Sequence, residues 1–248
     1  MTIEVSRVKT PEEQLAIPKG LSIFDPLLDH EVKEELESGG EVYISRDAQG
    51  NTNGLFIYDE CEATGTIFTK SSEVFDTFYK LKSSSYIFSE LEVVEIRSEV
   101  WNIWKLDVEK AKLGHRFKHQ VSMDHNVPEI ENFMADTRPE TNMKWIGVAL
   151  RNGDKCFVVK MQNRIVGMAW LSIAGDVARS HSIYVEPRFR RMGIMRDIFE
   201  ARLIYLKSRR VRTLINEVAD SNVESSSHVA KVGEKIVGKL FLYTSPDQ

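Results

Sequence analysis

The sequence predicts an α/β (α+β) protein in which helices flank a mixed central sheet. Two observations support this fold class. Short segments alternate apolar and polar side chains, as half-buried strands do, and turn residues separate several of them into hairpins. Between the hairpins lie amphipathic stretches with apolar residues at helical spacing. The 248 residues are enough for a full hydrophobic core in one large or two small domains.

The first half of the chain contains turn and helix-start signals that separate its elements. Gly39-Gly40 ends an amphipathic stretch, and residues 47–51 form a turn between alternating segments. The serine pair Ser71-Ser72 favours a helix start, because a serine oxygen accepts a hydrogen bond from a helix N–H group. The predicted elements are a helix at 30–38, strands at 41–45, 54–58 and 64–69, a helix after Ser71, and strands at 86–88 and 93–104.

The second half follows the same logic. Pro128 suits the first turn of a helix, and Gly233 suits the end of one. The predicted elements are a strand at 116–121, helices at 127–134 and 138–150, strands at 156–160, 165–173 and 180–185, a helix at 194–207, a strand at 213–218, a helix at 225–232 and a strand at 235–243.

The two halves share an order of elements, which is strand, turn, strand, strand, helix, strand. Gly54 follows the first hairpin turn as Gly167 follows the second. This weak repeat predicts two tandem units, at residues 1–114 and 115–248, and chance similarity between hairpins is the alternative.

The most informative stretch runs from Ile183 to Arg196. An apolar strand ends before Pro187, a basic loop with Arg190 and Arg191 follows, and Gly193 opens an amphipathic helix. The first N–H groups of a helix lack partners and lie at the positive end of its dipole, so they bind phosphate groups. The order of parts therefore predicts an anion site.

The charge distribution favours a small polyanion over a nucleic acid. Residues 188–212 contain nine Lys/Arg and two acidic residues, a local charge of +7, whereas the whole chain carries −4. A solvated basic helix face is the alternative. A module that binds nucleic acid through this stretch is disfavoured, because the rest of the chain is acidic and has no nucleic-acid motif.

The cysteines and the apolar segments indicate the compartment. Cys61 and Cys156 lie far apart without metal-binding spacing, which fits free thiols in a reducing compartment, although one bridge is also compatible. The N-terminus lacks signal-peptide features, and the longest apolar stretch, 165–174, is too short for a bilayer. We expect a cytoplasmic protein without a metal site or a membrane contact. The oligomeric state stays open.

From about His115 to Tyr243 the chain resembles a GNAT-superfamily N-acetyltransferase. That family carries Val-x-Pro-x-x-Arg-Gly-x-Gly-x-Gly/Ala between a strand and a helix, and residues 185–195 match it at Val185, Pro187, Arg190, Gly193 and Ile194. A second family signal, an asparagine, then a small residue three positions on, then Lys-x-Gly, matches at Asn222, Ser225 and Lys231-Val232-Gly233. The first half resembles a degenerate GNAT-like unit without the basic loop.

This resemblance implies an acyl-CoA N-acyltransferase-like fold that binds acetyl-CoA. Pantetheine contacts would fall on Ile183 and Val185, and Asn222 and Ser225 would line the other side of coenzyme A. The pyrophosphate contacts implied by the family fall on the loop and the helix start, at Arg190, Arg191, Met192, Gly193, Ile194, Met195 and Arg196.

Three residues depart from the family pattern. Arg191 replaces a glycine, which makes the loop less free to adopt left-handed conformations. Met195 replaces a small residue that lets the helix start approach the phosphate. Val229 stands where the family commonly has its general-acid tyrosine, so conventional acid catalysis is in doubt.

Direct acetyl transfer to an amine needs a group that removes a proton and a group that stabilises the leaving thiolate. Glu217 is the first candidate base, and His228 is a candidate acid. His181 is a third titratable group, and no Ser-His-Asp arrangement is recognisable from spacing. We therefore predict an acetyl-CoA-dependent N-acetyltransferase that acts on a small-molecule or protein amine. The alternative is a non-catalytic GNAT-like module that binds coenzyme A or a partner.

Overall fold

A computed structural model describes residues 3–9, 19–60, 63–82, 86–93, 97–137 and 143–244. Its contacts divide the chain into two compact units. Unit 1 comprises Met1–Ile103, Glu217–Ser227 and Ile236–Gln248, and unit 2 comprises Trp104–Asn216 and His228–Lys235. Two segments from the second half of the sequence therefore belong to unit 1. The predicted division at residue 115 remains a prediction about the tandem repeats.

Unit 1 is built on a sheet with the strand order β1, β2, β3, β4, β5, β12. Its core surrounds Phe56, Phe75 and Tyr243, where rings from a strand, a helix and the returning C-terminal strand meet. The elements are β1 (Glu4–Arg7), α2 (Asp25–Ser38), β2 (Glu41–Arg46), β3 (Thr52–Asp59), β4 (Thr64–Thr69), α3 (Ser72–Tyr79), β5 (Tyr86–Ser89) and most of β12 (Lys235–Thr244).

Unit 2 contains a second sheet segment with the strand order β11, β10, β9, β8, β7. Its elements are β7 (Val121–Asp124), α4 (Val127–Thr137), α5 (Lys144–Asn152), β8 (Lys155–Met161), β9 (Arg164–Ala174), β10 (Val177–Val185), η1 (Pro187–Phe189) and α6 (Ile194–Ser208). The elements that cross from one unit to the other are β6 (Arg97–Asp107), β11 (Thr213–Ala219), α7 (Val223–Lys231) and β12.

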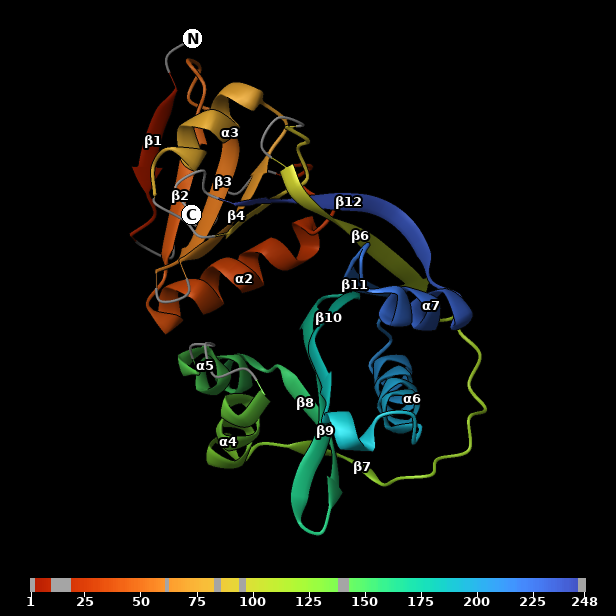
Figure 1. Cartoon of the computed structure of the whole chain (residues 1–248). Coiled ribbons are helices and arrows are strands. Elements are labelled where there is room, and N and C mark those ends of the chain that lie inside the picture. Colours follow the sequence, from red (N-terminus) through yellow and green to blue (C-terminus); the bar gives the residue numbers. More distant parts are fainter. Residues whose placement is uncertain are drawn as a thin grey trace. The chain divides into compact units, whose positions relative to one another are not determined.

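Strands β8 and β9 of unit 2 are largely apolar on both faces because helices cover both. Phe157 and Val159 of β8 pack with α6, whereas Cys156 and Val158 pack with α4 and α5. Figure 1 shows the same arrangement, with α4 and α5 on one side of β8–β10 and α6 on the other. Successive side chains of a strand point to opposite faces, so these runs read as continuously apolar.

Both units contain the predicted repeat. In unit 1, β4 pairs in parallel with β5 from Thr64 to Ile67, and α3 connects the two strands. In unit 2, β10 pairs in parallel with β11 from Val177 to Ser180, and α6 connects them. Each parallel pair follows an antiparallel hairpin, β2–β3 or β8–β9. The shared order of pairing supports the repeat at the level of topology.

The structure corrects one predicted element and extends others. The strand expected at 116–121 is wrong, because β7 begins only at Val121 and the preceding residues form a loop. Of the helix expected at 138–150, residues 138–142 lie outside the described part, and α5 covers the remainder.

The two cysteines differ in what can be said of them. Cys61 lies outside the described residues, whereas Cys156 is buried with a free thiol whose pKa is raised by burial and by the charge of Asp124. No described helix has both the length and the apolarity to cross a membrane.

Candidate functional site

The first half of strand β10 pairs with both β9 and β11, whereas among the described strands its second half pairs with β9 alone. Its parallel pairing with β11 runs from Val177 opposite Thr213 to Ser180 opposite Asn216. Its antiparallel pairing with β9 continues to Val185. Within the described residues, the later backbone groups on the β11 side therefore have no strand partner. Such groups form hydrogen bonds with a ligand readily.

A β-bulge lies in this half of β10. The register shifts between His181 and Tyr184, and Ser182 has a left-handed backbone with φ of +47°. A bulge leaves one residue unpaired, changes the direction of the neighbouring side chains, and is frequent beside active sites. The bulge therefore marks the part of β10 where side-chain directions depart from simple alternation.

The loop after β10 turns the chain into α6 through two left-handed residues. The chain first forms η1, and then Arg191 has φ of +63° and Gly193 has φ of +94°. Glycine adopts this conformation freely, whereas arginine pays a steric cost of about 1 kcal/mol. Arg191 adopts the left-handed conformation despite this cost, and the expectation that it makes the loop less free stays a prediction.

The first turn of α6 has no side-chain cap. Gly193 is its N-cap and has no side-chain oxygen to accept a hydrogen bond. In the first repeat, by contrast, the Ser71 hydroxyl accepts a hydrogen bond from the Val74 N–H group at 3.3 Å and caps α3. The leading N–H groups of α6, at Ile194, Met195 and Arg196, are thus free of a side-chain acceptor and can bind an anion.

The arginines of the loop fall into two groups. Arg188 forms an ion pair with Glu186 at 2.6 Å, and Arg190 donates from Nε to a β10 carbonyl at 3.2 Å. Arg191 and Arg196 are exposed, and neither has a carboxylate partner in the described part of the chain. These two guanidinium groups are therefore available for charge-assisted hydrogen bonds to phosphate.

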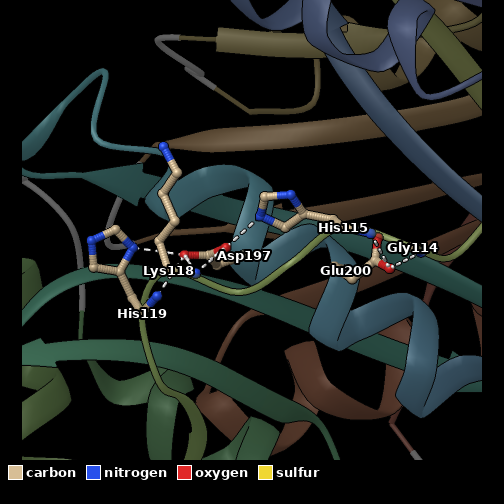
Figure 2. Close-up of polar contacts among 6 residues, drawn as sticks. All are labelled: Gly114, His115, Lys118, His119, Asp197 and Glu200. Carbon is tan, nitrogen blue, oxygen red and sulfur yellow. Dashed lines mark hydrogen bonds and ion pairs between the residues drawn. The ribbon is translucent and has the colours of Figure 1, made fainter.

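Asp197, in the first turn of α6, is fully buried, and its carboxylate faces His115 and His119 (Figure 2). Its carboxylate oxygens lie 2.5 Å from His115 Nε2 and 2.6 Å from His119 Nδ1, and they accept a hydrogen bond from the His119 N–H at 3.0 Å. Burial alone would raise its pKa, but these bonds and that from the Lys118 N–H outweigh burial and hold the pKa of Asp197 below its usual range.

A second carboxylate extends this contact along the helix. Glu200 accepts hydrogen bonds from the backbone N–H groups of Gly114 at 2.7 Å and His115 at 3.2 Å (Figure 2). Residues 114–119, which we call the strap, are thereby fixed across the first two turns of α6. The strap explains why the predicted strand does not form, since its polar groups bond to α6 instead of to a neighbouring strand.

The strap brings another cation to the loop. Lys118 is exposed, and its Cδ lies 3.6 Å from the position that a Cβ at Gly193 would occupy. Its side chain extends away from Asp197 in Figure 2. Sequence reasoning missed this residue, and no local signal identifies it, because only the distant carboxylates of α6 place it there.

The structure brings most of the predicted cofactor residues together in unit 2. Val185 and Ile194 are buried in the core between β10 and α6, and Ile183 and Met195 pack against the same core. Met192 is exposed at the loop tip. The pyrophosphate candidates from residue 190 to residue 196 therefore lie in the loop after β10 and in the first turn of α6.

The remaining two cofactor candidates belong to unit 1. Asn222 Oδ1 accepts a hydrogen bond from the Ser225 N–H at 3.1 Å, which caps the start of α7. This contact gives both residues a structural role. Their predicted place beside the cofactor stays a prediction.

The two catalytic candidates have different surroundings. Glu217 is half-buried on β11 in unit 1, and its role as a base stays a prediction. The His228 ring packs edge-on against Phe199, and its Nε2 is buried without a hydrogen-bond partner among the described residues. Burial and then nearby cations, Arg202 first, lower the pKa of His228, which disfavours the protonated form that a general acid needs. Val229 is buried.

A Ser-His-Asp cluster, which spacing did not reveal, lies on the opposite face of β10. The Ser172 hydroxyl donates to Asp154 Oδ2 at 2.6 Å and lies 3.0 Å from His181 Nε2. His181 stands opposite Trp170 in the β9–β10 register, directly before the bulge. Ser172 lies on β9, His181 on β10 and Asp154 directly before β8, so only the pairing of these strands reveals the cluster.

An open hollow of about 450 Å³ lies between the strap, β7 and α6. It is mainly apolar and includes none of the loop residues. Its lining comprises Phe117, His119, Gln120, Val121, Ser122, Met123, Phe157, Ala201, Ile204, Tyr205 and Ser208.

Several solved structures share the fold over nearly the whole chain. A protein from Drosophila superposes with a TM-score of 0.70 at 10% identity, covering 98% of this chain and 99% of its own. A tandem GNAT protein from the clavulanic acid biosynthesis pathway has a TM-score of 0.68 at 11% identity and covers 98% of both chains. A GCN5-related N-acetyltransferase from Sphaerobacter thermophilus has a TM-score of 0.63 at 11% identity, covering 98% of this chain and 95% of its own.

The sequence comparison locates the family in the second half of the chain. A search of curated proteins finds no match. The model of the acetyltransferase (GNAT) family matches residues 119–233, which include the strap end, β10, the basic loop and α6. Residues 119–233 therefore belong to the acetyltransferase (GNAT) family, and the chain as a whole has the fold of tandem GNAT proteins.

Proposed function

We propose that this protein is an acetyl-CoA-dependent N-acetyltransferase that acetylates a small-molecule or protein amine by direct transfer. The observation that carries the proposal is the uncapped start of α6, with Arg191, Arg196 and Lys118 around it, at the end of a half-paired strand. The first repeat lacks this arrangement, because Ser71 caps its helix. The match of residues 119–233 to the GNAT family supports an acyl-CoA donor.

Different groups of the site would bind different parts of acetyl-CoA. The N–H groups of Ile194 and Met195 and the cations of Arg191 and Arg196 would hold the phosphates. The exposed backbone edge of β10 would hydrogen-bond the pantetheine arm. Bound in this way, the donor supplies a thioester whose position is fixed before the amine arrives, which lowers the entropic cost of transfer.

Substitution of Gly193 tests the site. Gly193→Glu places a carboxylate at the helix start, where the side chain is strained and repels phosphate. We expect calorimetry to show loss of acetyl-CoA binding. The matched control is Gly175→Glu in the β9–β10 turn. Gly175 has a positive φ as Gly193 does, and an added Cβ there would have no neighbour within 4 Å. Unchanged affinity in Gly193→Glu would contradict the site.

Thiol release in the presence of amines tests the activity. A panel of spermidine, glucosamine, tyramine and a lysine peptide covers aliphatic, sugar, aromatic and protein amines. We expect thiol release above the acetyl-CoA-only rate with at least one of them. Binding of acetyl-CoA without release across the panel would favour the second candidate, a non-catalytic CoA-binding module. The buried Val229 at the position of the family's tyrosine supports that alternative.

A further inference from the structure

The cluster of Ser172, His181 and Asp154 has an order that differs from a nucleophilic triad. The serine lies in the middle, in contact with the carboxylate at 2.6 Å and the imidazole at 3.0 Å. Asp154 is 1% exposed, and the His181 side chain is 21% exposed. The histidine is thus the member that solvent and substrate can reach, whereas Ser172 is buried and occupied.

The donor and acceptor capacity of each group fixes the direction of the hydrogen bonds. A carboxylate only accepts, so the single hydroxyl proton of Ser172 goes to Asp154. The Ser172 oxygen must then accept from His181, which requires the proton on Nε2. In neutral His181 the unprotonated nitrogen is therefore Nδ1. Ser182 Oγ lies 3.3 Å from Nδ1, so a proton can arrive directly or through that hydroxyl.

The location of His181 connects it with the donor site. His181 precedes the bulge in β10, the strand whose later backbone edge has no β11 partner. It lies near the rings of Trp145 of α5 and Trp170 of β9, at 6.0 and 6.3 Å between centroids, on the sheet face covered by α4 and α5. The phosphate loop and α6 lie on the other face. A thioester that reaches the bulge along β10 would thus have His181 on the side opposite the phosphates.

We propose that His181 is the general base of acetyl transfer and that Ser172 and Asp154 are positioning residues that hold its reactive tautomer. This inference rests on the proposed function. The neutral amine attacks the thioester carbonyl carbon and forms the C–N bond. Nδ1 takes one proton from that nitrogen, the C–S bond breaks, and the thiolate of coenzyme A leaves with the electron pair. The imidazolium, balanced by Asp154 across Ser172, then returns its proton to the thiolate, so that amide and free thiol are the products.

The kinetic test compares His181→Ala with His125→Ala, in which an exposed histidine of the same unit is removed. We expect His181→Ala to lower kcat roughly 100-fold or more with the amine that the wild type uses, because a positioned base contributes that much. Its affinity for acetyl-CoA should stay within about twofold, and millimolar imidazole should restore part of the rate, which a structural defect would not allow. His181→Gln serves as the second variant if His181→Ala does not fold.

A second experiment tests the hydrogen-bonded chain from Asp154 through Ser172 to His181. Ser172→Ala should lower kcat with little change in KM, and Ser172→Thr, which keeps the hydroxyl, should restore most of it. Nitrogen NMR of the His181 ring in the whole protein should show the neutral tautomer protonated at Nε2 in the wild type and in Ser172→Thr. A neutral ring protonated at Nδ1 would overturn the assigned roles of Ser172 and Asp154, and this measurement does not require the amine substrate to be known.

The outcomes separate this inference from the proposed function. Equal rates in the wild type and His181→Ala would overturn the base assignment and leave the acetyltransferase proposal intact. Absence of amine-dependent thiol release in both proteins would overturn both. A large rate loss without imidazole rescue and with weakened acetyl-CoA binding would assign His181 a structural role and overturn the proposal.

Discussion

Arg191 stands where the family pattern has glycine, and it adopts a backbone conformation that glycine favours. Its φ of +63° belongs to the left-handed region, in which a side chain meets its own backbone. The loop keeps this conformation because the residues on both sides are fixed, by the Arg190 bond to β10 and by Gly193 at the helix start. The arginine therefore provides a cation at the expense of local backbone strain.

Two substitutions separate the charge of Arg191 from its strain. Arg191→Gly and Arg191→Ala both remove the cation, but only glycine relieves the backbone. We expect Arg191→Gly to be more stable than Arg191→Ala by about 1 kcal/mol in urea unfolding. Both should weaken acetyl-CoA binding to a similar extent. Equal stabilities would show that the loop does not hold this residue in the left-handed region.

Glu234 is a buried carboxyl group whose protonation affects stability. Its Oε2 accepts from Asn216 Nδ2 at 2.8 Å, and its Oε1 has no partner among the described residues. Burial raises the pKa of Glu234 to about 7, although the Asn216 bond and the charge of Arg202 oppose the rise. The folded state therefore holds a proton between about pH 4.5 and 7 that the unfolded state has released, so stability falls as pH rises through this window.

The substitution Glu234→Gln tests this pH dependence. In this variant an amide of about the same size replaces the carboxyl group, and the amide cannot ionise. At pH 5 the two proteins should unfold at similar urea concentrations. At pH 8 the variant should be more stable by roughly 2 to 3 kcal/mol, from about 1.4 kcal/mol per unit of pKa change. A difference in stability that does not change with pH would contradict the raised pKa.

The start of helix α6 is held by long-range contacts that local sequence does not reveal. Element types and order were predictable for most of the chain because apolar periodicity and turn residues act locally, as for β4 at Thr64–Thr69. The strand predicted at 116–121 is wrong because Asp197 and Glu200, far along the chain, bind the strap. The His181 cluster escaped prediction for the same reason, since the pairing of β8 with β9 brings Asp154 to Ser172 and the pairing of β9 with β10 brings His181 there.

Asp197 makes the contacts that hold residues 115–119 of the strap to α6. Asp197→Asn keeps the volume of the side chain but replaces the carboxylate that accepts from His115, His119 and the strap backbone. We expect the variant to lose about 2 to 4 kcal/mol of stability at pH 7. Because the folded pKa of Asp197 is lowered, its contribution is present above about pH 4 and is lost as pH falls through the folded value.

Urea unfolding at pH 7 and at pH 3 checks this prediction, with acetyl-CoA affinity as a second measurement. The stability gap between the wild type and Asp197→Asn should narrow at pH 3. Acetyl-CoA should bind more weakly to the variant, because the strap carries Lys118 to Gly193. A gap of the same size at both pH values would mean that the carboxylate charge does not hold the strap.

At the scale of the whole molecule, both repeats have a glycine beneath the start of a helix, but the two helix starts differ in their capping. Gly54 of β3 lies directly under α3, where an added Cβ would stand 2.5 Å from Val74 Cγ1. Gly167 of β9 lies under α6, where an added Cβ would stand 2.7 Å from Ile194 Cγ2. Each glycine lets a helix start approach its sheet. Of these two helix starts, only that of α6 lacks a side-chain cap, and the proposed function assigns ligand binding to that copy.

Matched alanine substitutions in the two repeats separate scaffold from site. Gly54→Ala and Gly167→Ala should each destabilise the protein by about 1 to 3 kcal/mol, because the new methyl group pushes the helix start outward. Calorimetry should show weaker acetyl-CoA binding only for Gly167→Ala, since Ile194 belongs to the uncapped turn whose N–H groups would hold the phosphates. Equal loss of affinity in both variants would mean that the first repeat also contributes to binding, and unchanged affinity in both would mean that the start of α6 does not hold the ligand.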